Sequence, residues 1–179
     1  MRVQRVQHYP LAADELLAVL TDRDFFLARH AMSGIADVHF DVFAEQRDGL
    51  LIRMLRDIDI PLEKVPSFAR RFLSSRATLV QEFLWYQRQQ QPFRARYRFA
   101  LGKVPVEVRG EVLLRDHQQG AEQQLKVEVN SSLPLIGSKL AALVGERVDR
   151  ALDSDYRATL RYLRERGMVD ADWLPSAHC

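Results

Sequence analysis

The sequence LPLIGSKLAALVGERVDRALDSDYRATLRYL, residues 133–163, decides the fold of this chain, because it predicts a single long helix. Its apolar residues recur every three or four positions, which is the spacing of an amphipathic helix. The helix should contain roughly 28 residues, span about 40 Å and end at Gly167. A helix of this length with one apolar side needs an extended apolar surface to cover it. The apolar stripe consists of Ile136, Leu140, Leu143, Val144, Val148, Leu152, Tyr156, Leu160 and Leu163.

The preceding stretch, residues 36–132, can supply that surface, because its hydrophobic period changes from about 3.6 to 2. We expect six consecutive antiparallel strands here, with a hairpin turn at Asp48-Gly49. The last four strands are predicted at 77–86, 92–101, 104–115 and 122–132. The first strand alternates Val38, Phe40, Val42 and Ala44 on one face with Asp37, His39, Asp41 and Phe43 on the other.

The charged residues of the last four strands predict how these strands pair. If the three loops centre on Gln89, on Gly102-Lys103 and on Gln118-Gln119, most of the charges meet a charge of opposite sign on the next strand. Each opposite-charge pair would contribute about 0.2–1 kcal/mol, and the charged face would lie in solvent. The predicted neighbours are Arg98 with Glu107, Glu82 with Arg96, Arg96 with Arg109, Arg94 with Glu111, Arg109 with Glu128, and Glu111 with Lys126.

The opposite face of the predicted sheet is apolar, and the long helix is the only predicted element large enough to cover it. Residues 61–75 interrupt the strands with Pro61 and Pro66 and with a helical spacing of apolar residues. We expect a short amphipathic helix at 65–74, with Phe68 and Phe72 covering the open end of the groove between sheet and helix. The sequence leaves open whether this segment is a lid.

The beginning of the chain predicts one more strand and two short helices. Residues 1–9 form the strand, which Pro10 ends. The helices are predicted at 12–20 and 23–31, with Asp22 as N-cap of the second and Ser33-Gly34 at its end. The predicted fold class is therefore α+β, with about seven strands around a long C-terminal helix.

Length and composition limit the classes of function. The 179 residues suit one domain, which we place at 1–166, followed by a tail at 167–179. A formal net charge of +2 gives no electrostatic argument for nucleic acid. The one cysteine, Cys179, permits no intramolecular disulfide. We find no signal peptide and no membrane span, and therefore expect a cytoplasmic protein without stable membrane insertion.

Motifs for catalysis or metal binding are not found in the sequence. We recognise no glycine-rich phosphate loop, nucleophile elbow or HExxH motif. Arg94, Arg96 and Arg98 could bind an anion, but the ladder of ion pairs explains them without a partner. We predict no metal site and no cofactor, because metal-ligand spacing is absent among His8, His30, His39, His117 and His178.

Polar residues on the apolar face of the sheet are more informative. Arg56, Gln81 and Tyr97 each occupy a position that should face the long helix. A buried charge is costly unless it is paired, so Arg56 needs a partner. That partner could be a ligand carboxylate or phosphate, or a protein carboxylate; alternatively, a β-bulge could turn Arg56 outward.

The order of elements resembles the helix-grip fold of the START-like superfamily, which includes pollen allergens, lipid-transfer domains and polyketide cyclases. The local resemblance lies in VQHYPLAADELLAVLTDRDFF, residues 6–26, and in the stretch at 133–163, and it is greatest to a bacterial family of unknown function. It implies a cavity between sheet and helix for a hydrophobic small molecule or lipid. A cyclase-type enzyme using Arg56, Tyr97 or His39, and an interaction protein with a solid core, remain alternatives.

The predicted cavity follows from shape, because a straight helix on a curved sheet leaves space where inward side chains are small. Ala95, Val108, Gly110 and Val127 are such positions. Cavities for such ligands are typically about 300–1,000 Å³. Ligand identity, cavity volume and oligomeric state stay open. We predict that the ligand-binding residues are Phe40, Arg56, Gln81, Phe83, Trp85, Tyr97, Phe99, Leu140, Val144 and Val148.

Overall fold

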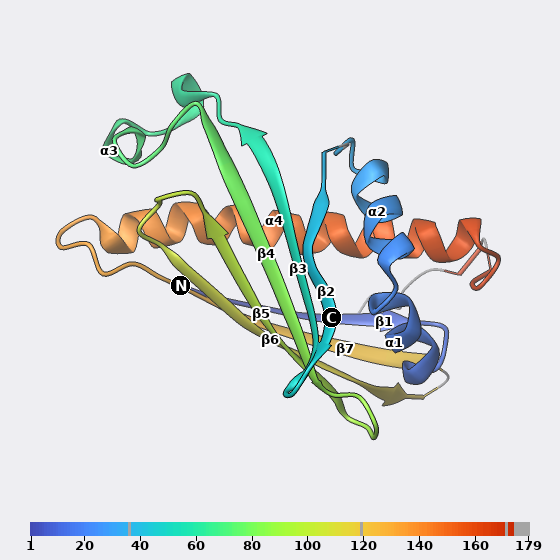
Figure 1. The fold of residues 1–179 in the computed structure, drawn as a ribbon. Coiled ribbons are helices and arrows are strands. Elements are labelled where there is room, and N and C mark those ends of the chain that lie inside the picture. Colours follow the sequence, from blue (N-terminus) through green and yellow to red (C-terminus); the bar gives the residue numbers. More distant parts are fainter. Residues whose placement is uncertain (36, 119, 171, 174–179) are drawn as a thin grey trace.

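The computed structural model describes residues 1–35, 37–118, 120–170 and 172–173, and shows one curved antiparallel sheet around a long helix (Figure 1). The strands are β1 (Arg2–Tyr9), β2 (His39–Gln46), β3 (Gly49–Asp59), β4 (Arg76–Gln87), β5 (Phe93–Leu101), β6 (Glu107–His117) and β7 (Gly120–Asn130). The helices are α1 (Ala13–Leu20), α2 (Arg23–Met32), α3 (Ser67–Arg70) and α4 (Gly137–Glu165), with a 3₁₀ turn at Leu62–Lys64. The predicted fold class is confirmed.

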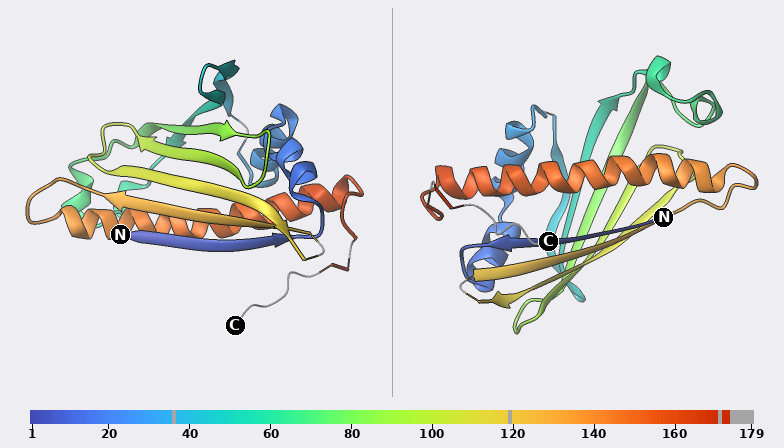
Figure 2. Two further views of the ribbon diagram at one scale, coloured as in Figure 1. Left: turned by 90° about the horizontal axis from the view of Figure 1, so that it is seen from below. Right: turned by 180° about the vertical axis from the view of Figure 1, so that it is seen from behind.

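The strands lie in the order β1-β7-β6-β5-β4-β3-β2, so the six strands from 36 to 132 form a continuous meander and β1 pairs with the last of them. The sheet twists strongly: β1 and β7 run close to the direction of α4, whereas β3 and β4 cross it steeply (Figures 1 and 2). Helix α4 packs most closely against β1, β7 and α2. The central strands β4–β6 and α4 therefore have an interior between them that side chains must fill.

The signals that begin and end the helices act as predicted. The Asp22 carboxylate accepts a hydrogen bond of 2.7 Å from the backbone N–H of Asp24 at the start of α2. Gly34 and Gly167 follow α2 and α4 with positive φ angles of 73° and 65°, which glycine adopts at little cost. Val169 is buried in the main core, so packed chain continues beyond residue 166. Cys179 and His178 lie outside the described residues.

The prediction for β2 was wrong after Phe40, because the pairing with β3 shifts by one residue between Phe40 and Val42. This β-bulge reverses the faces of the following residues. Phe43 points inward and its ring packs 5.3 Å from the ring of Phe40, centroid to centroid, whereas Ala44 is exposed. The bulge places both aromatic side chains of β2 in the interior.

The predicted pairing between β5 and β6 was wrong by two residues. Arg98 faces Arg109 rather than Glu107. The reason is Pro105, which has no N–H for a sheet ladder, so the loop extends over residues 102–106. A shift of two residues leaves each side chain on its predicted face, and Arg98 and Arg109 are exposed as expected.

The neighbouring hairpins show one more error and one success. Glu82 faces Arg98 rather than Arg96, because the loop after β4 is centred beyond Gln89, so that Gln87 already faces Arg94 where the ladder begins. The predicted pairing of β6 with β7 is confirmed. Its Cα partners include Arg109 with Glu128 and Glu111 with Lys126.

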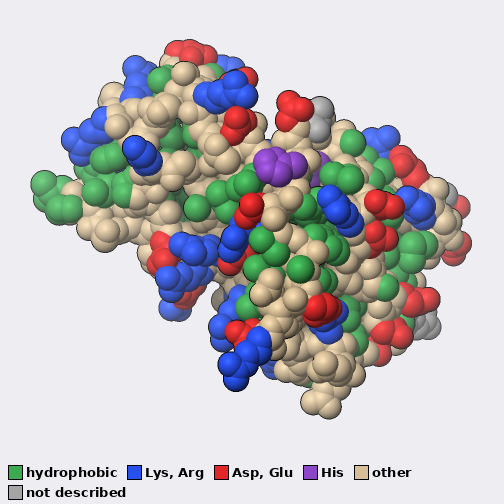
Figure 3. Space-filling view, in the orientation of Figure 1, with side chains coloured by type: hydrophobic (Ala, Val, Ile, Leu, Met, Phe, Trp, Pro, Cys, Tyr) green, Lys and Arg blue, Asp and Glu red, His purple; other side chains and the backbone are tan. Residues whose placement is uncertain are grey.

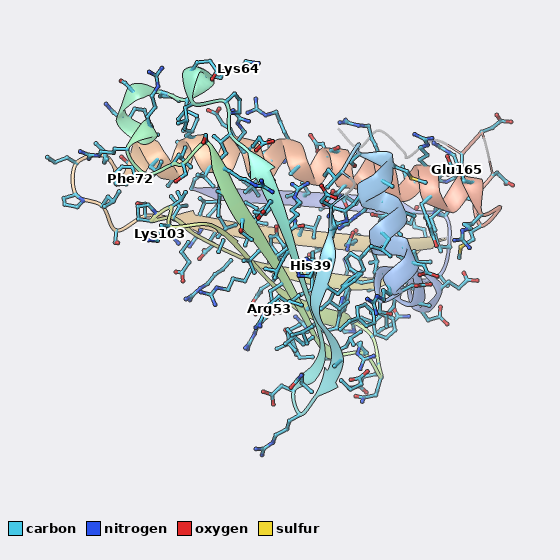
Figure 4. All side chains as sticks on the ribbon, turned by 45° about the horizontal axis from the view of Figure 1, so that its top comes forward. His39, Arg53, Lys64, Phe72, Lys103 and Glu165 are labelled. Atoms are coloured by element: carbon cyan, nitrogen blue, oxygen red, sulfur yellow. The ribbon has the colours of Figure 1, made fainter. Side chains whose placement is uncertain are left out.

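The inserted segment forms less helix than predicted. Helix α3 covers only Ser67–Arg70, so the helix predicted at 65–74 was too long. After it, the N–H groups of Phe72 and Leu73 donate to carbonyl oxygens three residues earlier, as in a turn. Phe68 and Phe72 do pack beside a small core of Val65, Ala69 and Leu140. Figure 4 shows Phe72 beside the first turns of α4, so this segment closes one end of the sheet–helix interior.

Candidate ligand pocket

A pocket lies between the inner face of the sheet, α2 and α4. Its volume is about 70 Å³, which is well below the 300–1,000 Å³ expected for ligand pockets. The interior is therefore nearly filled in this conformation. The walls are mostly apolar, with polar side chains among them, and include Tyr9, Phe26, Arg29, Phe83, Trp85, Tyr97, Val112, Leu125, Val127, Asp155 and Tyr156.

Arg29 of α2 brings a positive charge to this pocket while only 7% of the residue is exposed. Its guanidinium lies over the rings of Phe25 and Phe26, at 5.3 and 5.2 Å from the ring centroids. Its Nη1 is 3.6 Å from a carboxylate oxygen of Asp155 on α4, a long distance for an ion pair. In the part of the chain that the structure describes, the Nε–H of Arg29 has no hydrogen-bond acceptor.

Arg56 faces the interior from β3. It stands opposite Leu79 in an unbroken stretch of ladder, and Leu79 is 2% exposed, so no bulge turns Arg56 outward. Burial lowers the pKa of Arg56, and the carboxylate of Asp155 only partly offsets this effect. Among the described residues, nothing accepts a hydrogen bond from its buried Nε–H. A group left in this state costs roughly 1–3 kcal/mol.

Three further polar groups surround these arginines. Burial raises the pKa of Tyr97 to about 12, and a hydrogen bond with Gln81 acts in the opposite direction. His30 Nδ1 lies 2.7 Å from the carbonyl oxygen of Phe26. Burial and the nearby charge of Arg29 lower the pKa of His30, so this imidazole is neutral at pH 7. The inner cluster, defined as Arg29, His30, Arg56, Gln81, Tyr97 and Asp155, thus joins groups from α2, β3, β4, β5 and α4.

The predicted ligand-binding residues separate into several groups. Phe83, Trp85 and Tyr97 line the pocket, whereas Phe40 packs beside it against the main core. Gln81 and Arg56 belong to the inner cluster. The remaining four lie toward the other end of the interior: Phe99, Val144 and Val148 in a core with Val127 and Val108, and Leu140 beneath α3. His39, named for the enzyme alternative, is exposed on β2 (Figure 4).

The chain matches the family model described as "Protein of unknown function (DUF2505)" over residues 4–163. The chain belongs to this family. No curated protein matches it. The expected membership of a family of unknown function is therefore confirmed.

Solved structures with the same fold show how widely this architecture is shared by DUF2505 and other proteins. The structure of Ara h 8.0201 superimposes with a TM-score of 0.59 at 10% identity, covering 92% of this chain and 98% of that one. A protein from Rhodobacter sphaeroides gives 0.57 at 16% identity, covering 92% of each chain. A START superfamily protein from Mycobacterium smegmatis gives 0.51 at 11% identity, covering 90% and 98%. These likenesses confirm the predicted helix-grip fold.

Sequence reasoning missed Arg29 and Asp155, two charged residues that line the pocket. A signal for Arg29 was present, because it follows Phe25 by four residues and Phe26 by three, which places all three on one face of α2. Asp155 gave no such signal, because it adjoins Tyr156 at the edge of the helical stripe. Its role depends on how α2 docks against α4.

The structure also gathers possible metal ligands that the sequence spacing did not reveal. Atoms of His8, His117 and Glu122 lie within 4.8 Å of one another where β1 and β6 end and β7 begins. The Glu122 carboxylate is already bound by Arg115 at 2.8 Å and by Gln124 at 2.8 Å. These hydrogen bonds account for its burial without a metal ion.

Several charges on the outer face are matched within the protein. Arg53 bonds to Glu82, Arg2 to Glu128 at 2.9 Å, and Arg109 pairs with Glu107. Figure 3 shows positive and negative side chains interspersed over the visible surface. None of the helices in the described residues combines the length and hydropathy needed to cross a membrane.

Proposed function

We propose that this DUF2505 protein binds a hydrophobic small molecule or lipid in the pocket between the sheet and α4. The observation that supports this proposal is the pocket wall, which combines aromatic side chains with buried donors that the described chain leaves unsatisfied. Trp85 is 2% exposed, yet its indole N–H has no acceptor among these residues. A solid core built only for stability would gain from satisfying such a group.

The small volume determines how binding must occur. A space of about 70 Å³ holds water-sized groups, so a larger ligand must displace side chains or separate α2 and α3 from the sheet. Helix α3 is short and covers one end of the interior, where Leu140 contacts it. We propose this end as the entrance, which would make the inserted segment a lid.

Seven of the ten predicted ligand-binding residues fit this proposal as two parts of one site. Phe83, Trp85 and Tyr97 would contact the ligand near α2, and Phe99, Leu140, Val144 and Val148 would line the path from α3. A cytoplasmic location agrees with this function and stays a prediction.

The experiment uses N-phenyl-1-naphthylamine, a neutral apolar dye that fluoresces when it leaves water. The wild type should bind it saturably, and Val127→Trp should abolish binding, because Val127 lines the pocket and is 2% exposed. Since the pocket is small, Val127→Trp should also lower the free energy of unfolding by about 1–3 kcal/mol through overpacking.

The matched control is Leu84→Trp. Leu84 lies on β4 and points to the outer face of the sheet, away from the pocket, so this variant should leave dye binding unchanged. Absence of saturable binding by the wild type, or equal binding by the wild type and Val127→Trp, would contradict the proposed function and favour a solid core. Native mass spectrometry of protein from its own host would then look for a carried lipid directly.

A further inference from the structure

The inner cluster has an excess of positive charge in an apolar interior. Arg29 and Arg56 each carry one positive charge, and Asp155 carries one negative charge. Within residues 1–35, 37–118, 120–170 and 172–173, Asp155 is the one carboxylate at ion-pair distance from Arg29, and none lies that close to Arg56. His30 adds no charge at neutral pH. Two guanidinium groups therefore share one carboxylate.

Asp155 itself is poorly placed to satisfy either arginine. Its side chain is 41% exposed, and the 3.6 Å separation from Arg29 exceeds that of a direct charged hydrogen bond. The carboxylate can therefore remain hydrated while the two guanidinium groups lie deeper. A buried cation without a close anion is unfavourable, and an anion that enters with the ligand would remove this cost.

The unsatisfied buried groups around the pocket share one chemical property. Arg29 Nε, Arg56 Nε and Trp85 Nε1 are all N–H donors. The side chains that have partners here, such as the Tyr9 hydroxyl with Gln7 and Gln123 at 3.2 Å, satisfy each other. Around the pocket, the groups that the described chain leaves unsatisfied are thus donors. A ligand group that only accepts hydrogen bonds, such as a carboxylate, complements this arrangement.

We propose that the natural ligand is a hydrophobic carboxylic acid, bound as the anion with its carboxylate between Arg29 and Arg56 and its apolar body against Phe83, Trp85 and Tyr97. This inference rests on the proposed function and names its ligand class. A carboxylate matches the planar guanidinium and accepts two parallel hydrogen bonds from it. An alcohol or a sterol would leave the excess positive charge in place.

Isothermal titration calorimetry with decanoate and with 1-decanol tests the charge separately from the apolar chain. The full-length wild type should bind decanoate about ten- to hundredfold more tightly than decanol, the range expected for hydrogen bonds to a charged group. Arg56→Met should remove most of this preference by weakening decanoate alone. Arg56 is only half-buried, so this variant should fold.

Two further variants complete the experiment. Arg98→Met removes an exposed arginine from the outer face and should leave both affinities unchanged. Asp155→Asn removes the competing carboxylate and should tighten decanoate binding several-fold without changing decanol binding. This gain of affinity cannot arise from misfolding, so it keeps the test valid even if a loss-of-charge variant is unstable.

The outcomes separate the two proposals. Equal affinities for decanoate and decanol, or a preference that Arg56→Met and Asp155→Asn leave unchanged, would overturn the proposal of a carboxylic acid as ligand. Either result would still support a hydrophobic pocket. If Arg98→Met weakened decanoate binding as much as Arg56→Met does, the carboxylate would bind at the outer face. That result would overturn the proposed carboxylate site as well. Binding of neither compound, together with no binding of the neutral dye, would contradict the proposed function itself.

Discussion

Strand β3 carries two arginines three residues apart, and the two faces of the sheet treat them differently. Arg53 points to the outer face, where it bonds to Glu82 at 2.8 Å and to Asp41 at 3.3 Å. Arg56 points inward and has no such partner among the described residues. The pKa of Arg53 is raised, chiefly by its hydrogen bond to Glu82, whereas burial lowers the pKa of Arg56. On this strand, the arginine that water already screens is matched, and the arginine for which matching would matter most is not.

This contrast indicates that the inner face is not optimised for stability alone. Exposed ion pairs contribute little, often less than about 1 kcal/mol, so the outer pairs add little to the stability of the sheet. An unmatched cation in the interior costs more than such pairs return. Natural proteins retain costs of this kind mostly at functional sites.

The largest expected effect compares neighbouring residues on opposite faces of β3. Ile52 is 0% exposed, so Ile52→Ala should lower the free energy of unfolding by about 2–5 kcal/mol through lost burial and the cavity left behind. Arg53→Ala should lower it by less than about 1 kcal/mol, because its ion pairs lie near solvent. Urea denaturation measures both. Similar losses for the two variants would mean that the faces do not differ in burial.

A smaller effect is expected when two histidines are compared, the buried His30 of α2 and the exposed His39 of β2. Burial lowers the pKa of His30 in the native protein. As the pH falls, the unfolded chain therefore binds a proton at this residue at a higher pH than the native chain does. Stability that is present above the unfolded pKa of about 6.5 should therefore be lost as the pH falls toward the native value.

Thermal melting between about pH 7.5 and about pH 5.5 measures this loss. His30→Gln should reduce the pH-dependent drop in melting temperature, since glutamine does not titrate. His39→Gln, on the exposed side of β2, should melt with the same pH dependence as the wild type. An identical drop in all three proteins would show that His30 does not contribute to acid sensitivity.

The smallest expected effect tests the strand register on the outer face. Arg96 lies opposite Glu111 in the structure, and a double-mutant cycle with alanine at both positions should give a coupling of about 0.2–1 kcal/mol. Arg98 and Glu107, which the sequence paired, should show no coupling. The coupling should also decrease in high salt, because the pair is exposed. If Arg98 and Glu107 were coupled instead, β5 and β6 would pair in the register that a two-residue turn at Gly102-Lys103 predicts.

Sequence periodicity was enough to predict one long C-terminal helix, the meander of six strands and the two faces of the sheet. These features repeat over many residues, so a single local irregularity does not obscure them. The error at β5–β6 shows the limit: a shift of two residues changes each partner but keeps each side chain on its face, so hydrophobicity cannot detect it. The bulge after Phe40 is a shift of one residue, and it reversed the expected side of Phe43.

The sequence by itself predicted that Gln81 and Tyr97 would face an apolar interior, because alternation along each strand fixes the direction of a side chain. For Arg56 it left a β-bulge open, and the unbroken β3–β4 ladder decided the direction. Only the tertiary structure decided which groups meet there. Arg29 and Asp155 are 126 positions apart, and they approach because α2 docks on α4. Such contacts depend on the relative placement of whole elements, which no local period records. The same placement, rather than any motif, decided that the positive charge of the interior would exceed its negative charge.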